Sequence, residues 1–207
     1  MGYSASQAKA FIAHIAPLIC EEADRRGYTI KSTVIAQAIV EGSAGTSVLA
    51  KRYHNHFGMK CGSSWRGKSV NLATKEEYTV GTLTNIRANW RVYDSDAEGV
   101  EGYYDFIGVK RYSNLRQAKD FRQYAEYLKS DGWATSSTYV NTLVNTVNKY
   151  SLYVYDKGVV TKSVHEIALE VINGEWSVGT ERKKLLTKAG YNYVEVQAEV
   201  NRILKTK

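Results

Sequence analysis

The sequence predicts a mostly helical α+β protein in which helices come first, a small sheet follows and helices return. Three observations lead to this prediction. Apolar residues recur at helical spacing in residues 5–26 and again from residue 97 onward. Residues 42–93 are instead rich in glycine, serine, threonine and aromatic residues. Within them, short alternating runs such as "NWRVY" are typical of strands.

The first helix is expected over residues 5–26. Its apolar face is formed by Ala8, Phe11, Ile12, Ile15 and Ile19. Pro17, the only proline, should kink this helix or start a second one, because proline lacks an N–H donor. Gly27 is the expected stop. A second helix is predicted over residues 33–40, capped by Ser32 or by its neighbour Thr33.

Three further helical faces follow the predicted sheet. They are formed by Val100, Tyr104 and Ile107, by Ala118, Phe121, Ala125 and Leu128, and by Val140, Leu143, Val144 and Val147. Residues 155–163 have no long period and are predicted to be a linker. Residues 164–207 then show three short helical segments, close to the lower size limit for independent folding. We therefore predict a main domain over 1–154, a linker over 155–163 and a small three-helix module over 164–207.

The composition is ordinary for a globular protein, with 43% hydrophobic and 24% charged residues. No apolar run reaches 18 residues, so neither a transmembrane helix nor membrane insertion is expected. The first residues lack a basic segment and a long apolar segment, so we expect no secretory signal peptide. Cys20 and Cys61 are accordingly expected to stay reduced.

The net charge of +7 favours polyanionic surroundings, which include nucleic acid, an anionic membrane or an acidic cell-wall polymer. The 16 tyrosines and four tryptophans add flat rings, which suit sugar faces as well as bases. Charge and aromatic content alone leave these partners open.

The stretch "VIAQAIVEGSAG" draws attention to Glu41. A mostly apolar run ends on this carboxylate, just before a Gly-Ser-Ala-Gly break. Val34, Ala38 and Glu41 stand at i, i+4 and i+7, so the carboxylate shares a face with apolar residues, in the last turn where the helix dipole is negative. Both effects should raise the pKa of Glu41 towards that of a general acid. On these residues alone, a solvent-exposed helix end remains the alternative.

A glycosidase normally needs a second carboxylate, or a substrate group in its place. The sheet region offers four candidates, and their spacing does not choose among them. These candidates are Glu76, Glu77, Asp94 and Asp96.

Other chemistries have less support in the sequence. His54 and His56 form one HxH pair, but no third zinc ligand stands at a recognisable spacing, so structural or surface histidines are expected. No dinucleotide-binding, P-loop or GxSxG motif occurs. A Cys61 nucleophile with one of these histidines remains an alternative. We therefore expect neither a metal nor a cofactor.

Several short motifs follow one another in a fixed order. They read Gln37-Ala38-Ile39-Val40-Glu41, Ser47-Val48-Leu49-Ala50, Asn55-His56-Phe57-Gly58-Met59-Lys60, Trp65-Arg66-Gly67 and Lys75-Glu76-Glu77-Tyr78. Further along come "WRVYDSDAEGVEGYYDFI" and "YAEYLKSDGWATSSTYVNTLVNTVNKYSL". This ordered set resembles glycoside hydrolase family 73, the N-acetylglucosaminidases, over about residues 5–153.

The resemblance implies a lysozyme-like fold, in which helices surround a small β-lobe. It implies cleavage of the β-1,4 bond that follows N-acetylglucosamine in peptidoglycan, with Glu41 as the general acid. It also implies that a carboxylate of the β-lobe acts as the base or activates water, and Glu77 matches this position best, with Glu76 adjacent. The substrate-binding residues that it implies are Phe57, Trp65, Tyr112 and Tyr139.

Three positions depart from the family pattern. Gly42 replaces the serine after the acid, Ala44 replaces an aromatic residue, and Ser137-Thr138 replaces the Asp-Pro before Tyr139. The missing aromatic ring removes one sugar contact that the family pattern implies. We therefore expect a wider cleft beside residues 42–45.

The last segment carries a second ordered motif. Its residues are Gly174, Trp176, Gly179, Arg182, Leu186, Ala189, Gly190 and Tyr191. They resemble a CW_7 repeat, a wall-binding module of phage lysins, which implies a three-helix bundle that binds muropeptide. Trp176 would stack on sugar, Arg182 would bind a carboxylate of the peptide stem, and Tyr191 is a third candidate. Framework roles in a small core are the alternative.

Together these observations predict a bacteriophage or prophage endolysin that cuts between N-acetylglucosamine and N-acetylmuramic acid. It would be made in the cytoplasm of the host bacterium and act on the wall after release. The alternatives are a muramidase, which cuts the other glycan bond, and a wall-binding protein with an inactive catalytic domain. A nucleic-acid partner is not expected, because nine Lys/Arg and seven Asp/Glu give residues 155–207 a net charge of only +2.

Overall fold

The computed structural model describes residues 2–79, 82–156, 162–189 and 191–205, with the backbone alone at residues 74–79, 82–86 and 188. Its backbone contacts form two compact units. Unit 1 comprises Met1–Glu22 and Gln37–Val109, and unit 2 comprises Ala23–Ala36 and Lys110–Lys207. Since unit 2 includes residues from both predicted modules, the boundaries at 154 and 164 stay a prediction. None of the described helices is long and apolar enough to cross a membrane.

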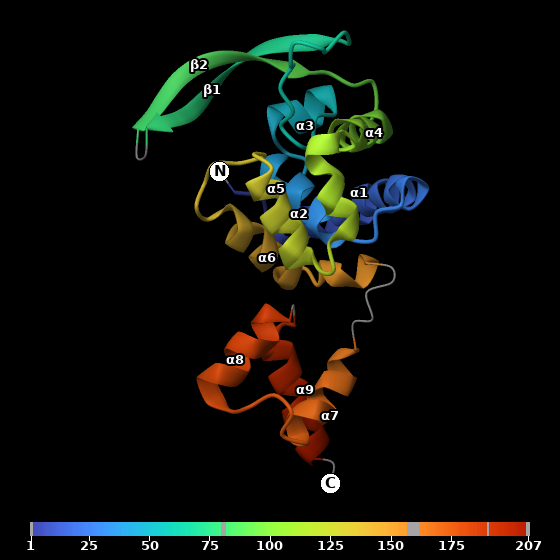
Figure 1. The fold of residues 1–207 in the computed structure, drawn as a ribbon, viewed down its shortest axis with the longest axis vertical. Helices are drawn as coiled ribbons and strands as arrows, with labels where there is room; N and C mark the ends of the chain where they lie inside the picture. The colour runs from blue at the N-terminus through green and yellow to red at the C-terminus, as the bar shows by residue number, and fades with distance from the viewer. Residues whose placement is uncertain (1, 80–81, 157–161, 190, 206–207) are drawn as a thin grey trace. The chain divides into compact units, whose positions relative to one another are not determined.

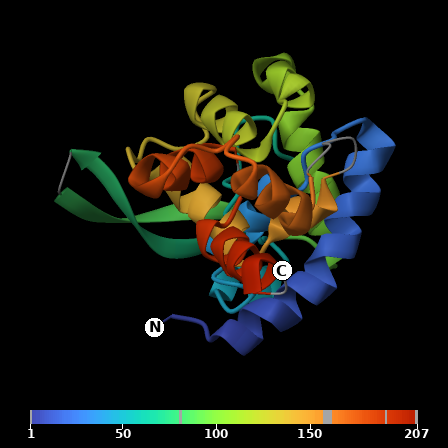
Figure 2. The same ribbon diagram turned by 90° about the horizontal axis from the view of Figure 1, so that it is seen from below.

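Unit 1 contains the small sheet and the helices next to it (Figure 1). Its elements are most of α1 (Ala5–Arg26), the end of α2 (Ser32–Glu41), α3 (Val48–Tyr53), β1 (Ser69–Thr79), β2 (Thr82–Arg91) and α4 (Asp96–Ile107). α1 continues past Pro17 as one helix (Figure 2). It ends where predicted, because Gly27 adopts a left-handed φ of 76° and Tyr28 N–H donates to Ala23 O at 2.9 Å.

α2 is a core helix with a single exposed end. Residues 32–39 are all buried, and its apolar side chains fill the core. Glu41, its last residue, is exposed. The chain then turns sharply through Ser43, Ala44 and Gly45, whose φ values of 50°, 50° and 77° are all left-handed. Because two of these residues are not glycine, the turn after Glu41 is strained.

The predicted small sheet is a single antiparallel hairpin. β1 pairs with β2 in a register that runs from Ser69 opposite Arg91 to Thr79 opposite Thr82, with an irregularity between Glu77 and Thr79. The two strands form a long twisted ribbon that extends away from α3 and α4 (Figure 1). An isolated bridge between Lys60 and Trp90 attaches the preceding loop to the base of this ribbon.

Unit 2 contains two groups of helices. The first group is η1 (Lys110–Gln117), α5 (Phe121–Ser130), α6 (Tyr139–Lys149) and η2 (Leu152–Tyr155), and here α5 packs on η1 and α6. The second group is α7 (Val164–Ile172), α8 (Gly179–Lys188) and α9 (Tyr193–Lys205). This second group has a hydrophobic core of its own, formed by Ile167, Ala168, Val171, Leu186, Tyr191, Val196, Val200 and Ile203.

The predicted cap of α2 was wrong. α2 begins at Ser32, and Ile35 N–H donates to Lys31 O at 2.9 Å, so Lys31 stands at the cap position. The hydroxyls of Ser32 and Thr33 donate elsewhere, to Asp156 Oδ2 and to the carbonyl of Phe121. The carboxylate of Asp156 takes the place of the local cap, although it lies 124 residues away in the sequence.

Candidate functional site

Glu41 stands at the end of a buried helix and faces the loop that follows α3. A Cβ placed on Gly58 would lie 3.9 Å from Glu41 Oε2 and 4.0 Å from the ring of Trp90, so Gly58 adjoins both the carboxylate and this ring. As predicted, Glu41 lies in the last turn of α2. The burial expected for this carboxylate is not observed, because Glu41 itself is exposed at the last turn, where the apolar face ends.

Asn55 holds this loop in place. Its side chain donates to the carbonyls of Met59 at 2.8 Å and Arg91 at 2.9 Å, and accepts from Met59 N–H at 2.8 Å. Arg91 N–H in turn donates to Met59 O at 3.0 Å. The loop carrying Gly58 is therefore joined to the end of β2 by a buried amide, which gives the asparagine of the Asn-x-Phe-Gly motif a structural reason.

Phe57 supports the loop from inside the core. It is only 1% exposed, and its ring stacks on Tyr103 of α4 with centroids 4.1 Å apart. Tyr103 Oη donates to Gln37 Oε1 at 2.6 Å, which links α4 to α2 one turn before Glu41. The buried ring of Phe57 is not available to a sugar, so its contribution to a site is to position Gly58.

Trp65 is half-buried at the base of the hairpin. The guanidinium of Arg91 lies 4.5 Å from the centre of its ring, and Tyr93 meets it edge-on at 5.8 Å. Its Nε1–H donates to Lys68 O at 3.0 Å. A Cβ on Gly67 would lie 2.4 Å from this ring, which explains the glycine of the Trp-x-Gly motif. Trp65 therefore has framework contacts while part of it remains accessible.

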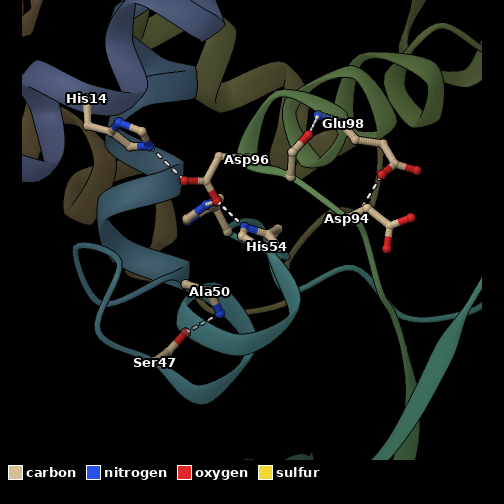
Figure 3. Close-up of polar contacts among 9 residues, drawn as sticks. His14, Ser47, Ala50, His54, Asp94, Asp96 and Glu98 are labelled. Atoms are coloured by element: carbon tan, nitrogen blue, oxygen red, sulfur yellow. Dashed lines mark hydrogen bonds and ion pairs between the residues drawn. The ribbon is translucent and has the colours of Figure 1, made fainter.

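Three histidines converge on one carboxylate at the start of α4 (Figure 3). Asp96 Oδ2 lies 2.7 Å from His14 Nε2, and its Oδ1 lies 2.6 Å from both His54 Nδ1 and His56 Nε2. Burial alone would raise the pKa of Asp96, but hydrogen bonds from His54, His56 and His14 outweigh it and hold the pKa well below the usual range. Asp96 is thus an ionised acceptor. Burial lowers the pKa of His56, and Asp96 offsets this only in part.

These contacts are hydrogen bonds and not metal coordination. Two ligands of a tetrahedral zinc ion stand roughly 3.3 Å apart when each bond is about 2.0 Å long, whereas the nitrogens here lie 2.6–2.7 Å from the carboxylate oxygens. Across the described ranges, no group of His, Cys, Asp or Glu side chains is arranged to hold a metal ion.

The cluster borders a pocket of about 340 Å³ beside the turn after Glu41. The lining residues are Gln7, Ala10, Phe11, His14, Ala44, Gly45, Thr46, Ala50, Lys51, His54, His56 and Asp96. The pocket thus lies where the sequence has Ala44 in place of the family's aromatic residue. The backbone there leaves little space, because a Cβ would approach Phe11 to 2.7 Å at Gly45, and the Ala38 carbonyl to 2.7 Å at Gly42.

The candidates for a second carboxylate now differ in their environment. Asp96 is engaged by three imidazoles, and Asp94 pairs with Lys68 at 2.6 Å while its N–H donates to Glu98. Asp96 is therefore an occupied acceptor, whereas Asp94 stands in an exposed ion pair. The backbones of Glu76 and Glu77 lie in β1, opposite Thr84 and Leu83, while their side chains fall outside the described part of the chain.

Tyr112 and Tyr139 lie in unit 2, and both are buried. Tyr112 sits at an irregular point of η1, edge-on to Trp133 with ring centroids 6.4 Å apart, and burial raises its pKa. Tyr139 is the first residue of α6 and is 6% exposed. Any contact of these tyrosines with a ligand is limited to the small exposed part of each ring.

The residues predicted to bind the wall have framework contacts in the last three helices. Tyr191 belongs to their core, and Trp176 packs edge-on against it at 6.1 Å while its Nε1–H donates to Glu170 at 2.8 Å. Arg182 bridges two helices, since it donates to Ser177 O at 3.0 Å and to Gln197 Oε1 at 3.3 Å. Trp176 and Arg182 are both half-exposed, whereas Tyr191 is buried.

Sequence reasoning missed the histidine cluster and the distant cap of α2. The HxH spacing gave His54 and His56, but His14 and Asp96 come from other elements, 40 or more residues away. Asp156 likewise has no neighbour in the sequence that indicates its partner. Both sites depend on long-range packing, which no local motif reports.

Residues 16–152 match the Glucosaminidase family, described as mannosyl-glycoprotein endo-beta-N-acetylglucosaminidase, and residues 165–204 match the CW_7 repeat. The chain is similar to exo-glucosaminidase LytG of Bacillus subtilis, with 30% identity over 136 residues, which is 63% of this chain and 47% of LytG. It is also similar to peptidoglycan hydrolase FlgJ of Pseudomonas aeruginosa, with 30% identity over 72% of this chain and 38% of FlgJ. The chain therefore spans less than half the length of either relative.

A solved structure supports the fold. The catalytic domain of the autolysin Auto from Listeria monocytogenes superposes with a TM-score of 0.63 at 27% identity, covering 75% of this chain and 91% of that domain. The family match covers more than half of the chain and includes every motif from Gln37 to Tyr78. The mostly helical, lysozyme-like architecture predicted from the sequence is confirmed. The chain belongs to the Glucosaminidase family, glycoside hydrolase family 73, and carries a CW_7 repeat after the family domain.

Proposed function

We propose that this protein is a peptidoglycan hydrolase, an endo-β-N-acetylglucosaminidase with Glu41 as its general acid. One observation carries the proposal: in a chain of this family, an otherwise buried helix ends in an exposed carboxylate beside the Gly58 loop. The names of two relatives, a glucosaminidase and a peptidoglycan hydrolase, agree with this substrate. Bacteriophage origin stays a prediction.

In the proposed reaction, the Glu41 carboxyl group gives its proton to the glycosidic oxygen as the bond from that oxygen to the anomeric carbon breaks. Positive charge develops at the anomeric carbon, as in other glycosidases. Water then attacks this carbon and loses its proton to a base, or the 2-acetamido oxygen of the substrate attacks first and water opens the resulting ring. In the first route the base releases its proton to solvent, and Glu41 takes one back from solvent. In the second route Glu41 removes a proton from the attacking water and so regains its protonated form.

Glu77 is the proposed base, and Glu76 is its neighbouring alternative. Support comes from Asp96, another candidate of this region, because its carboxylate already accepts from three histidines. Asp94 is paired with Lys68 only at the surface. Since consecutive residues of a regular strand alternate between its faces, we expect one of the two glutamates to act, and not both.

The remaining predicted residues receive more limited roles. Trp65, which is partly accessible, is proposed to contact the glycan directly, whereas buried Phe57 acts through the Gly58 loop. Tyr112 and Tyr139 are proposed to contact the glycan through their exposed edges. In the CW_7 repeat, we propose that half-exposed Trp176 and Arg182 contact muropeptide and that Tyr191 supports them from the core.

The test is digestion of purified peptidoglycan, reduction with borohydride and mass spectrometry of the new ends. The expected result is fragments cut from within the strand whose new ends are reduced N-acetylglucosamine. Reduced N-acetylmuramic acid would overturn the proposal in favour of a muramidase, and release of single terminal sugars would show an exo-enzyme.

Glu41→Gln should lower the rate by roughly 10²-fold or more while leaving the circular dichroism spectrum unchanged. A Glu41→Gln variant that digests the wall normally would refute the assignment of the acid.

A further inference from the structure

The N-terminus of α2 is held by a buried carboxylate that lies just beyond the family match, which ends at residue 152. Asp156 Oδ1 accepts from Lys31 N–H at 2.6 Å and from Ser32 N–H at 2.7 Å. Its Oδ2 accepts from Ser32 Oγ at 2.6 Å. Asp156 is 8% exposed, and Lys31 and Ser32 are fully buried. These contacts satisfy N–H groups that have no partner within the helix.

Two further contacts fix the same end of the helix. The Lys31 ammonium lies 2.8 Å from the carboxylate of Asp24, and Thr33 Oγ1 donates to Phe121 O at 2.8 Å. Lys31 and Thr33 are fully buried, so water does not readily replace their contacts, whereas Asp24 is exposed. Residues 31–33 are therefore attached to three separate segments of unit 2, around residues 24, 121 and 156.

A helix transmits the position of one end to the other. α2 has ten residues and is about 15 Å long at 1.5 Å per residue, and residues 32–39 are buried. The helix has little freedom to bend, so a shift or rotation at Ser32 moves Glu41. A displacement of about 1 Å in a catalytic group can cost roughly 10²-fold in rate.

We propose that Asp156 is a positioning residue for the glycosidase reaction, because it fixes the register and the axial position of the helix that ends in Glu41. The inference rests on the proposed role of Glu41. Asp156 does not touch the reacting atoms. It acts through the backbone of residues 31 and 32.

The test compares three variants of the full chain. Asp156→Ala removes all three hydrogen bonds. Asp156→Asn keeps an oxygen for the two N–H groups and can donate to Ser32 Oγ, so it should restore the geometry without the charge. Leu128→Ala is the matched control, since Leu128 is fully buried near the end of α5 away from Phe121, takes part in none of the hydrogen bonds that hold residues 31–33, and its truncation lowers stability.

The readout is the rate on solubilised, uncrosslinked glycan strands. It is measured at a temperature where melting curves show each variant to be at least about 95% folded. We expect Asp156→Ala to lower kcat by roughly 10- to 100-fold with KM within about twofold. Asp156→Asn should stay within about threefold of the parent, and Leu128→Ala should retain kcat. The alkaline limb of the pH profile, which reports the acid, should shift in Asp156→Ala and stay in Leu128→Ala.

If Asp156→Ala does not fold, Asp156→Ser, which keeps a shorter acceptor, replaces it and should lower kcat with KM unchanged. If the Asp156 variants lose no more kcat per folded molecule than Leu128→Ala, the inference is wrong. Glu41→Gln in the same assay separates the two proposals: activity in that variant refutes the role of Glu41, whereas its inactivity together with normal Asp156 variants refutes only the positioning role.

Discussion

Carboxylates of this protein differ mainly in the partners that surround them. Asp96 collects three imidazoles, Asp156 collects two backbone N–H groups and a hydroxyl, and Glu41 projects from a helix end beside Gly58. The first two are held in place as acceptors. Glu41 is the one of the three that faces outward. At the scale of single residues, the environment therefore separates structural acids from the candidate catalytic acid.

Gly58 provides a direct test of the space beside Glu41. Its φ is +61°, and an added Cβ would lie 3.9 Å from Glu41 Oε2. Gly58→Ala should therefore lower the free energy of unfolding by about 1–2 kcal/mol through backbone strain and should also lower kcat. Gly62→Ala is the control, because no atom lies within 4 Å of its Cβ and its φ is not positive. Equal behaviour of the two variants in thermal melts and rate assays would contradict this view of the loop.

The histidine cluster predicts how stability changes with pH. The pKa of folded His56 is lowered, so the unfolded chain binds the proton more readily and stability should fall as the pH drops through about 6.5. The pKa of folded Asp96 is also lowered, so a second fall should follow below about pH 4. Both effects act in the same direction.

Thermal melts between pH 8 and pH 3 would measure this dependence. Asp96→Asn should be less stable at pH 7 and should show a smaller fall below pH 4, because the lowered pKa values of other carboxylates, such as Glu199, remain. A parent protein whose melting temperature stays constant from pH 7 to pH 5 would contradict the assignment to His56.

At the scale of elements, α2 connects the core to the site. It is fixed at its start by Asp156, along its length by burial and near its end by the bond from Tyr103 to Gln37. The strained left-handed turn at residues 43–45 then directs the chain away immediately after Glu41. The helix is therefore held at both ends, and its last residue is presented at the surface.

Tyr103→Phe tests the contact near the end of α2. The variant keeps the ring that stacks on Phe57 but removes the hydroxyl that donates to buried Gln37. We expect a loss of about 1–3 kcal/mol in the free energy of unfolding, because a buried acceptor loses one of its donors. Urea denaturation of the variant and the parent measures this. A loss below about 0.5 kcal/mol, the lower end for an ordinary hydrogen bond, would show that the bond contributes little.

Local sequence patterns predicted the positions of helices better than the tertiary contacts that hold these helices in place. Helical spacing placed α1, and Gly27 marked its end, because both depend on neighbours in the sequence. The same reasoning chose Ser32 or Thr33 as the cap of α2, since it considers only residues beside the helix. The actual cap comes from Asp156, and tertiary contact alone brings it there. Glu41 could be found because the ordered motifs around it are local, whereas the Asp96 cluster joins three separate elements.

At the scale of the whole molecule, the family domain and the CW_7 repeat are matched by separate segments, residues 16–152 and 165–204. The last three helices have a hydrophobic core of their own. This agrees with the proposal that one segment cuts the glycan and the other holds the wall.

A chain ending at residue 163 tests this division of roles. We expect it to cleave soluble glycan strands at a rate within about twofold of the full chain, because Asp156 and the family domain remain. Its retention on purified walls should fall at least about tenfold, since a second attachment to the same polymer raises the effective concentration of the enzyme. Co-sedimentation with walls and the soluble assay measure the two effects. Unchanged sedimentation would assign wall binding to the family domain.

The position of Asp156 sets a limit for exchanging wall-binding modules between enzymes of this kind. The boundary predicted from the sequence, at residue 154, would place Asp156 in the discarded part and leave the N–H groups of Lys31 and Ser32 without their acceptor. A chimera joined after residue 156 retains that acceptor. Its new module can then change which walls the protein recognises without loosening the helix that carries Glu41.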